Sequence, residues 1–593
     1  MKKNKLWLFV ALFAAVVLIL AACGENNNNN NNNDNDTPPV VDNNNNANND
    51  TPDPGNGVVD SNLPAGVYVD DNGNYRFTNT RNISVALWER PNERMPVMAE
   101  SYWAEWVAEQ MLATHNVQVE WVTVPRWGPE HEHMSMLIGA GDAPDVSFSI
   151  NHAMVQTFQG MGALQDLAPL LDTYRDLLPN MFNLVGEELI YWDQNPITGE
   201  LFNITGRLFQ DGSNLMFIRE DWLAALDLPI PSNFDEFEYT LRAFRDRASE
   251  LPGYETMNFV VPYMLGSDDI TWHGGILFQS LVPSDISDRD WFVYGQPGNA
   301  NERLFHHREV MREGTRIWNR WFNEGLLYDG IAVSDNDAQN DLIANGWVGA
   351  FSGNWDFPYR ASPGFIPSIR ENTGVEDANF IPILPFLNDA GNPQIFMPNP
   401  TDRRIFFPQG NNEQLASLLY LDFMSRPEVL DFLQFGYEGV HHEVLPNGAI
   451  ATFPQDYPNP WPNNQLFTVI RNFDIALMVN GVHFWDTNHS AAEQTVALGY
   501  PGIPADLIIQ ARNLGLNNGR WFPPVPAPPL VAVEEHNSGL ISQRIDLLVR
   551  LVAGTSVEDF DAAFDREYDA YLRMGGQAII DERAQVWEQL FGN

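Results

Sequence analysis

Aromatic and hydrogen-bonding side chains gather where two expected strands end. An alternating apolar stretch at 83–87 and a second at 146–148 each run directly into polar residues. The residues at these two ends are Trp88, Glu89, Arg90, Ser149, Asn151 and His152. An indole face stacks on apolar C–H groups, while carboxylate, guanidinium, amide and imidazole groups fix hydroxyls around it. Because ligands of open parallel sheets sit beyond the carboxyl ends of the strands, we expect these residues to line a ligand cleft.

A third aromatic candidate is Trp272, which precedes His273, Gly274 and Gly275 in loop-like sequence. Loops placed on a rigid scaffold often carry binding residues. The competing interpretation is structural, because the chain has 18 tryptophans and most of them must belong to a core.

The distribution of lysine and cysteine excludes several kinds of chemistry. All three lysines lie within the first five positions, so every later cation among the 33 Lys and Arg residues is an arginine. Without lysine the chain can build neither a Walker phosphate loop nor a Schiff base. The single cysteine, Cys23, excludes an internal disulfide and a cysteine zinc site. The net charge of −45 disfavours nucleic acid as a partner.

Other enzyme signatures are missing, although one alternative stays open. The spacing of His131, Glu132 and His133 does not fit a zinc helix, and Asp335 and Asp337 lack the glycine of a calcium loop. The chain has no G-x-S-x-G elbow. A glycoside hydrolase needs only two suitably spaced carboxylates, and 78 acidic residues could supply them. We expect a binding protein with no catalytic residue, metal or cofactor, with a secreted glycoside hydrolase as the alternative.

The elements that must position these residues begin near residue 75. Alternation at 83–87, 117–122 and 146–148 predicts three strands, and apolar residues at helical spacing across 98–111 and 134–138 predict two helices between them. This β-α-β-α-β order predicts a parallel sheet with right-handed crossovers.

Later segments are richer in helix. Asn233 and Glu236 stand in the spacing of a capping box, apolar positions across 310–321 mark a helix, and another at 415–423 is expected to be closed by Pro427. The Asp221–Trp222 pair is typical of a helix start rather than of a site. About 530 residues follow the N-terminal segments, more than one core usually accommodates, so we expect two α/β lobes.

The N-terminus has the pattern of a lipoprotein signal. Three lysines precede an apolar run at 6–20, and small residues then lead to Cys23. We therefore expect a signal peptide at 1–22, a lipid on Cys23, and an Asn-rich disordered tether across 23–74. The acidic, lysine-free body fits an alkaline or saline habitat, and codon bias explains it equally well.

Several segments together resemble the extracellular solute-binding proteins of sugar importers, in the maltose-binding-like group and nearest its alginate-oligosaccharide-binding branch. The likeness runs from about residue 83 to the C-terminus and is clearest to 447. The segments that carry it are 136–146 (MLIGAGDAPDV), 162–167 (GALQDL), 216–223 (MFIREDWL), 349–355 (GAFSGNW) and 435–443 (FGYEGVHHE).

This resemblance implies a two-lobed, periplasmic-binding-protein-like α/β fold of type II, with a hinge and a central ligand cleft. It implies one lobe from 75–205 plus 396–453 and a second from 206–395 plus 454–593. By the same resemblance Trp355 lies at the cleft wall, and Glu438 and His441 either reach the cleft or cap the connection between lobes. The family's usual aromatic and acid are replaced by Ser149 and His152, which disfavours maltose as the ligand.

The implied function is that of a monomeric substrate-binding subunit of an ABC importer. It would bind a carbohydrate, best an oligosaccharide, and deliver it to permease subunits from the outer face of a bacterial membrane, that of a Gram-positive cell. Three alternatives stay open: a hydrolase, a binder of peptide or another solute, and an anchored module that displays or senses a polymer without importing it.

Overall fold

The computed structural model describes residues 63–89, 98–125, 130–209, 212–266, 275–295, 305–360, 364–397, 399–453, 475–480, 489–522, 525 and 527–592. The expected signal peptide, Cys23 and most of the expected tether lie outside these residues. No helix within the described ranges is both long enough and apolar enough to cross a membrane.

Two sheets organise the described chain. The first has the strand order β15-β6-β12-β5, and the parallel pair β3–β4 joins it through a bridge from Val85 to Val146. Its strands are β3 (Arg81–Glu89), β4 (Val117–Pro125), β5 (Ser147–Ser149), β6 (Ile204–Leu208), β12 (Thr401–Phe406) and β15 (Val479–Asn480). The β-α-β-α-β order expected from the sequence is confirmed, with β3 and β4 parallel along nine residue pairs.

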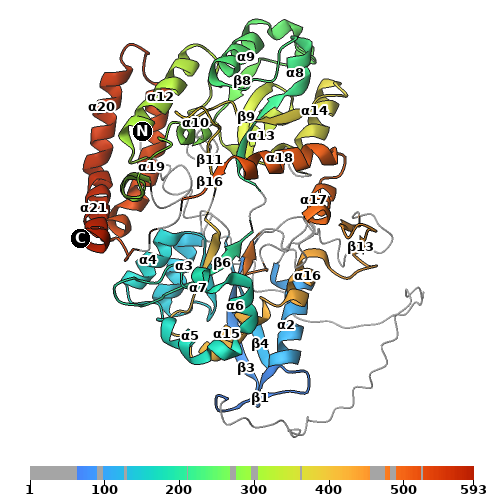
Figure 1. The fold of residues 1–593 in the computed structure, drawn as a ribbon, viewed down its shortest axis with the longest axis vertical. Coiled ribbons are helices and arrows are strands. Elements are labelled where there is room, and N and C mark those ends of the chain that lie inside the picture. Colours follow the sequence, from blue (N-terminus) through green and yellow to red (C-terminus); the bar gives the residue numbers. More distant parts are fainter. Residues whose placement is uncertain are drawn as a thin grey trace, which may run out of the picture. The chain divides into compact units, whose positions relative to one another are not determined.

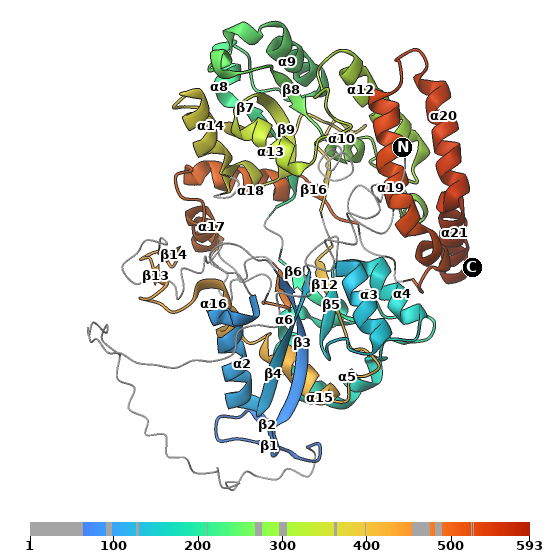
Figure 2. The same cartoon turned by 180° about the vertical axis from the view of Figure 1, so that it is seen from behind.

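Helices cover the first sheet and enclose one hydrophobic core. Helix α2 shows how the sequence achieves this, because Trp103, Val107 and Met111 recur on its buried face, while Ser101 caps its start. Figure 2 shows α2 beside β4. The helices around this core are α2 (Tyr102–His115), α3 (Glu130–Ala140), α4 (His152–Gly160), α5 (Ala168–Tyr174), α6 (Pro179–Val185), α7 (Glu187–Ile190), α15 (Gln414–Phe423) and α16 (Pro427–Phe435).

The second sheet has the order β10-β7-β9-β8, in which only β8 and β9 are parallel. Its strands are β7 (Asn214–Arg219), β8 (Val261–Met264), β9 (Val348–Asn354) and β10 (Phe380–Ile383). All four are almost wholly buried, as expected for a sheet covered on both faces.

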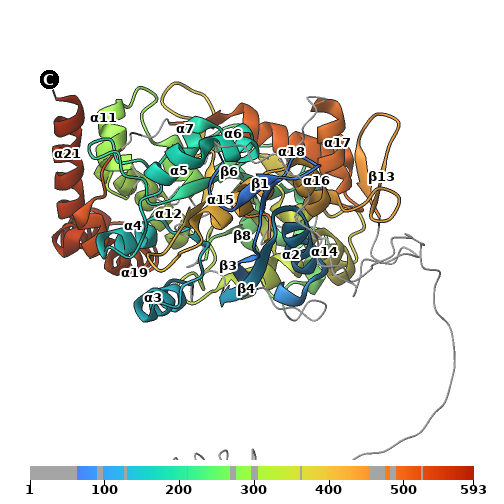
Figure 3. The same cartoon turned by 90° about the horizontal axis from the view of Figure 1, so that it is seen from below.

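Eleven α-helices of four or more residues lie in the described segments around the second sheet, and with it they form a second core. They are α8 (Glu220–Ala225), α9 (Phe234–Asp246), α10 (Gly275–Ser280), α12 (Arg308–Asn323), α13 (Asn336–Ala344), α14 (Phe365–Thr373), α17 (His489–Leu498), α18 (Ala505–Asn517), α19 (Val531–Ala553), α20 (Phe560–Tyr571) and α21 (Gln577–Phe591). Figure 1 shows α12, α19 and α20 side by side, and Figure 3 shows α17 next to α18.

The chain passes between the two cores three times. Core residues of the first lobe run to Ile204, resume at Ile405 and return once more at 475–479. Those of the second lobe begin at Leu215, pause after Phe396 and resume at Val496. Two-stranded connections accompany this exchange: β11 (Ile395–Phe396) pairs with β16 (Gly519–Arg520), and the hairpin of β13 (His442–Val444) and β14 (Ile450–Thr452) follows α16.

The expected boundaries differ from this arrangement at three points. Strand β1 (Val67–Val69) pairs with β2 (Tyr75–Phe77) and reaches the first core through Val67, so folded chain begins before residue 75. The stretch 475–479, assigned to the second lobe from the sequence, packs in the first core instead because its apolar side chains meet β6 there. Pro427 does not end a helix but begins α16, where its missing N–H costs nothing.

A ladder of charges and rings joins α12 to α20. Arg308, Arg312 and Arg316 repeat every fourth residue on α12, and the guanidinium of each lies over one aromatic ring of α20. The distances to the ring centres are 5.0 Å for Arg308–Tyr568, 4.9 Å for Arg312–Phe564 and 5.6 Å for Arg316–Phe560. The same arginines form ion pairs with the carboxylates of α20. These pairs are Arg308–Asp565 (2.8 Å), Arg308–Asp569 (2.8 Å), Arg312–Asp565 (2.6 Å) and Arg316–Asp561 (2.5 Å).

We expect the ladder to weaken in acid. Hydrogen bonds from Arg308 and Arg312 hold the pKa of Asp565 below its ordinary value. A carboxyl group whose folded-state pKa is depressed stabilises the fold above its unfolded pKa of about 3.9, and this contribution disappears as pH falls through the folded value. The melting temperature of Asp565→Asn should therefore lie below that of the wild type at pH 7, and the gap should close toward pH 3.

The control variant is Asp546→Asn, which removes an exposed carboxylate from neighbouring α19. It should melt with the wild type throughout the pH range. A gap for Asp565→Asn that stays constant from pH 7 to pH 3 would show that the charge of Asp565 does not stabilise the helix pair.

Candidate functional site

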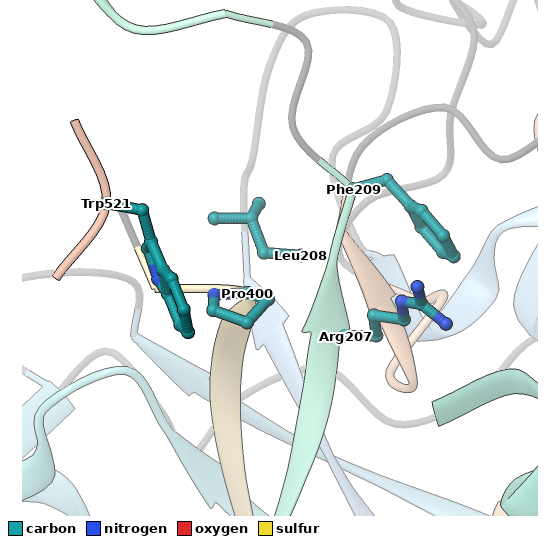
Figure 4. A pocket seen from close by; sticks show the side chains of 5 residues that line it. All are labelled: Arg207, Leu208, Phe209, Pro400 and Trp521. Atoms are coloured by element: carbon teal, nitrogen blue, oxygen red, sulfur yellow. The ribbon is translucent and has the colours of Figure 1, made fainter. Parts of the chain in front are cut away.

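A pocket of about 310 Å³ opens where β6 ends and β12 begins. It is lined by Arg207, Leu208, Phe209, Pro400 and Trp521 (Figure 4). A second pocket of about 350 Å³ adjoins it and shares Arg207, Pro400 and Trp521. The second pocket is further lined by Val185, Gly186, Glu187, Glu188, Leu189 and Trp192, which belong to α6, α7 and the residues around them.

Backbone hydrogen bonds fix the pocket floor. The Leu208 N–H donates to the Pro400 carbonyl oxygen at 2.9 Å, and the Phe209 N–H donates to that of Asn480 at 2.7 Å. The three strands of the first sheet that meet here are therefore tied together at their ends. Trp521 comes from elsewhere in the chain, one residue after β16, and Figure 4 shows its ring beside Pro400.

Trp521 has the exposure that a binding platform requires. It is 44% exposed, and it is the single tryptophan of the described ranges that counts as an exposed large apolar residue. Trp192, in the adjoining pocket, is half-buried. We call the two adjoining pockets the trough. The indoles of Trp521 and Trp192 line it and offer apolar faces to a ring-shaped ligand.

Arg207 borders both pockets, but its side chain lies on the opposite side of β6 from Trp521, next to Phe209 (Figure 4). Its guanidinium lies 4.6 Å from the Phe209 ring, and Nη1 donates to the Leu184 carbonyl oxygen at 2.8 Å, at the C-terminal end of α6. Burial lowers the pKa of Arg207 from a high ordinary value, so the group stays charged at neutral pH. Glu188, on the rim, is exposed and adds acceptor oxygens. The two adjoining pockets thus combine two aromatic faces with one exposed carboxylate.

Trp88, expected as a platform, is instead a core residue. It is 0% exposed, its indole N–H donates to a Glu130 carboxylate oxygen at 3.2 Å, and its ring packs edge-on against Phe148 at 5.0 Å. The guanidinium of Arg403 lies 5.1 Å from the same ring. No face of Trp88 is left for a ligand, and this expectation was wrong.

Glu89, the residue after Trp88, has a structural contact instead of a free binding face. The Glu89 carboxylate is partly exposed and accepts the Met98 N–H at 3.1 Å, which ties the end of β3 to the chain that follows. Arg90 and Trp272 lie outside the described residues.

The polar residues after β5 mainly stabilise the N-terminus of α4. Ser149 is buried and its hydroxyl accepts the Asn151 N–H at 2.9 Å, while the Asn151 side chain caps α4 by accepting the Met154 N–H at 3.2 Å. His152 is partly exposed, with Nδ1 3.8 Å from a carboxylate oxygen of Asp193. Desolvation lowers the pKa of His152 and the Asp193 charge opposes this. These residues lie together as expected, but none of them lines either pocket.

Trp355 is also covered. It is 8% exposed, belongs to the second core and meets the ring of Tyr500 edge-on at 5.9 Å. A platform needs an open face, so the structure does not support the expected role of Trp355 as a ligand contact.

Glu438 and His441 lie in the turn between α16 and β13. Glu438 is exposed, whereas His441 is buried and its Nδ1 accepts the Tyr437 N–H at 2.8 Å. Burial, with a smaller effect of the neighbouring His442, lowers the pKa of His441 to about 4. His441 therefore stays neutral and holds this turn through the hydrogen bond from Tyr437. Neither residue lines the pockets.

The sequence did not single out Trp521, Trp192 or Arg207. Trp521 precedes Phe522 and two prolines, a context that indicates irregular chain but does not distinguish it from other tryptophans. Within the described ranges, no three His, Cys, Asp or Glu side chains converge as metal ligands would.

Comparison with known proteins identifies the architecture. No protein-family model matches the chain. Lipoprotein LipO of Bacillus subtilis (strain 168) is 26% identical over 296 residues, which are 48% of this chain and 53% of LipO, so the chain spans about half the length of this curated relative. The structure of the alginate-binding protein AlgQ2 without calcium ion matches 89% of this chain and 100% of its own, with a TM-score of 0.59 and 17% identity. The chain has the solute-binding-protein fold.

Two further structures agree with this solute-binding-protein fold. A human-milk-oligosaccharide (HMO) binding, ABC-transporter-associated protein of Bifidobacterium longum infantis ATCC 15697 covers 86% of this chain and 99% of its own, with a TM-score of 0.56 and 16% identity. The S. pneumoniae substrate-binding protein FusA, an EF-hand mutant in complex with fructo-nystose, covers 86% and 100%, with a TM-score of 0.57 and 13% identity. These structures are binding proteins rather than enzymes.

Proposed function

We propose that the chain is the substrate-binding subunit of an ABC importer, that it binds an oligosaccharide by closing two lobes, and that it hands this ligand on unaltered. The observation that carries the proposal is Trp521, exposed over a pocket at the point where a solute-binding-protein fold passes from one core to the other. The proteins with similar folds are named for alginate, milk oligosaccharides and fructo-nystose, which supports carbohydrate as the ligand class.

The form of the trough favours an oligosaccharide over a single sugar. Two adjoining pockets of about 310 and 350 Å³ share one wall, and each has the size of a site for a drug-sized molecule. In the proposed complex, one ring stacks on Trp521 and a second approaches Trp192. The Glu188 carboxylate then accepts hydrogen bonds from hydroxyl groups of the ligand.

The proposal extends to cellular context. The lipid on Cys23 and the Asn-rich segment behind it would hold the protein at the outer face of the membrane of a Gram-positive bacterium, and the similarity to lipoprotein LipO supports this anchoring. A monomer would present its closed form to the permease subunits. The lobes would comprise 63–205 with 399–453 and 475–480, and 212–397 with 489–592.

The test of this function is titration calorimetry with fructo-oligosaccharides, human milk oligosaccharides and alginate oligosaccharides, followed by chromatography of each recovered ligand. Saturable heat with unchanged saccharide is expected. Shorter products would indicate a glycoside hydrolase. Heat with peptides but with none of the saccharides would overturn the ligand class.

Replacing Trp521 with alanine should weaken binding of the best saccharide by about 1–3 kcal/mol, because the exposed ring loses its stacking and buried area. Trp521→Phe should retain part of the affinity. Since the side chain is 44% exposed, the free energy of unfolding should barely change. Calorimetry and urea unfolding measure the two quantities.

The matched control is Trp587→Ala, which removes a partly exposed indole from α21, where it packs on Phe591. This variant should bind as the wild type does. If Trp521→Ala binds the saccharide with unchanged affinity, the ligand does not bind in this pocket.

A further inference from the structure

Gly212 is held on two sides at the point where the chain enters the second lobe. A Cβ atom added to Gly212 would lie 2.7 Å from the Trp355 indole, closer than real Cβ contacts come. On the other side, a Cβ on Gly515 of α18 would lie 2.9 Å from the Ser213 nitrogen and 3.5 Å from the Gly212 Cα. The backbone at 212–213 is therefore clamped between a tryptophan ring and a helix, at distances that only glycines permit.

The backbone conformation of Gly212 reinforces this arrangement. Its φ of +149° lies in a region that residues with side chains rarely adopt. The direction of the chain at Gly212 thus depends on the absence of a side chain there and on the Trp355 ring that lies against it. Strand β7 begins two residues later and carries this direction into the second sheet.

Trp355 is itself firmly supported. Its ring meets that of Tyr500, whose hydroxyl donates to Asp356 Oδ2 at 2.8 Å. Arg360 donates to both oxygens of the same carboxylate, at 2.9 and 2.7 Å. The end of β9 and the chain after α17 therefore hold one face of the clamp in place.

The opposite end of this connection is anchored separately. Leu208 and Phe209 donate their N–H groups to Pro400 and Asn480, all within the first sheet or at its edge. These two hydrogen bonds involve no atom of Gly212, so a substitution there leaves both of them in place.

We propose that Trp355 is a positioning residue: by clamping Gly212 it sets the direction in which the chain joins the two lobes, and so the balance between open and closed forms. The part that concerns ligand affinity rests on the proposed function. If a ligand binds only one of the two forms, its apparent affinity falls with the fraction of protein in the other form. A shift in this balance therefore changes the apparent affinity even when no contact to the ligand is lost.

The experiment measures the lobes without ligand. In a Cys23→Ser background, dyes are attached at Asp172→Cys of the first lobe and Glu371→Cys of the second, both exposed positions. Single-molecule energy transfer then gives the distribution of inter-lobe distances. Trp355→Ala should shift this distribution, and Trp355→Phe should restore most of it. Gly212→Ala should shift it with Trp355 intact, because its Cβ meets the ring.

Two further measurements make the outcome decisive. The saccharide that binds best to the wild type should show a change in Kd of at least about fivefold for Trp355→Ala, within the range typical of coupled equilibria. Circular dichroism melting confirms that each variant is folded, and Trp347→Ala, which removes another partly buried indole of the second lobe, should leave the distribution unchanged.

An unchanged ligand-free distribution in folded Trp355→Ala would overturn the proposal, whether or not affinity falls. If affinity collapsed with that distribution intact, Trp355 would be a ligand contact. If no saccharide bound even the wild type, the proposed function would fail, and the ligand-free distances would still decide the role of the clamp.

Discussion

Replacing Asp221 with alanine should lower the free energy of unfolding by about 3–5 kcal/mol, because it strands a buried cation. Arg219 is 0% exposed, and its Nε and Nη2 donate to the two Asp221 carboxylate oxygens at 2.8 and 2.6 Å. Its Nη1 donates to the Gly346 carbonyl oxygen at 3.0 Å, which alone cannot offset a guanidinium removed from water. Urea unfolding followed by circular dichroism measures the loss.

A double variant separates the charge from the packing. Arg219→Met combined with Asp221→Leu removes both charges and keeps an apolar volume, and it should recover much of the stability lost by Asp221→Ala, since buried ion pairs are often replaceable in this way. Glu376→Ala, at an exposed position of the same lobe, should leave unfolding unchanged. A loss below about 1 kcal/mol for Asp221→Ala would mean that water reaches Arg219.

Trp88→Ala should cost about 3–5 kcal/mol in free energy of unfolding while leaving the affinity of the folded protein unchanged. The reason is a cavity, because the fully buried indole packs on Phe148 and under Arg403. Its removal also leaves the Glu130 carboxylate without the indole donor. Trp88→Phe should lose less, since it keeps a ring.

The measurement pairs urea unfolding with calorimetry of the protein that remains folded. Trp88→Ala and Trp521→Ala should give opposite profiles, the first losing stability and the second losing affinity. Loss of affinity with an unchanged free energy of unfolding in Trp88→Ala would place a ligand against this ring and contradict its assignment to the core.

The first lobe could be predicted because local periodicity and topology agree there. Alternation at 83–87 and 117–122 reports strands, and the helix between them forces β3 and β4 to be parallel. The second sheet was harder to predict from the sequence. Its strands are buried on both faces, so they do not alternate, and β7 finds β10 more than 150 residues later in an antiparallel pairing that no local signal specifies.

The site was harder to predict than the fold. The prediction placed the end of the first strand at residue 87, but β3 continues to Glu89, and those two extra residues carry Trp88 into the core. Trp355 follows β9 in a similar way and is covered by the chain at Gly212. Trp521 reaches the pocket from more than 300 residues after Arg207, through the pairing of β11 with β16. Such convergence is decided by tertiary packing, which residue type and spacing do not encode.

The alternation of the chain between two cores has a consequence for biogenesis. In the proposed export, the polypeptide emerges from the membrane N-terminus first, yet the first core needs apolar residues up to Val479 before it is complete. Under this proposal the first core stays incomplete until after most of the second lobe has emerged. Cutting the chain once at any position would likewise not separate one complete lobe from the other, because each core draws on chain from both sides of any such cut or leaves part of its partner attached.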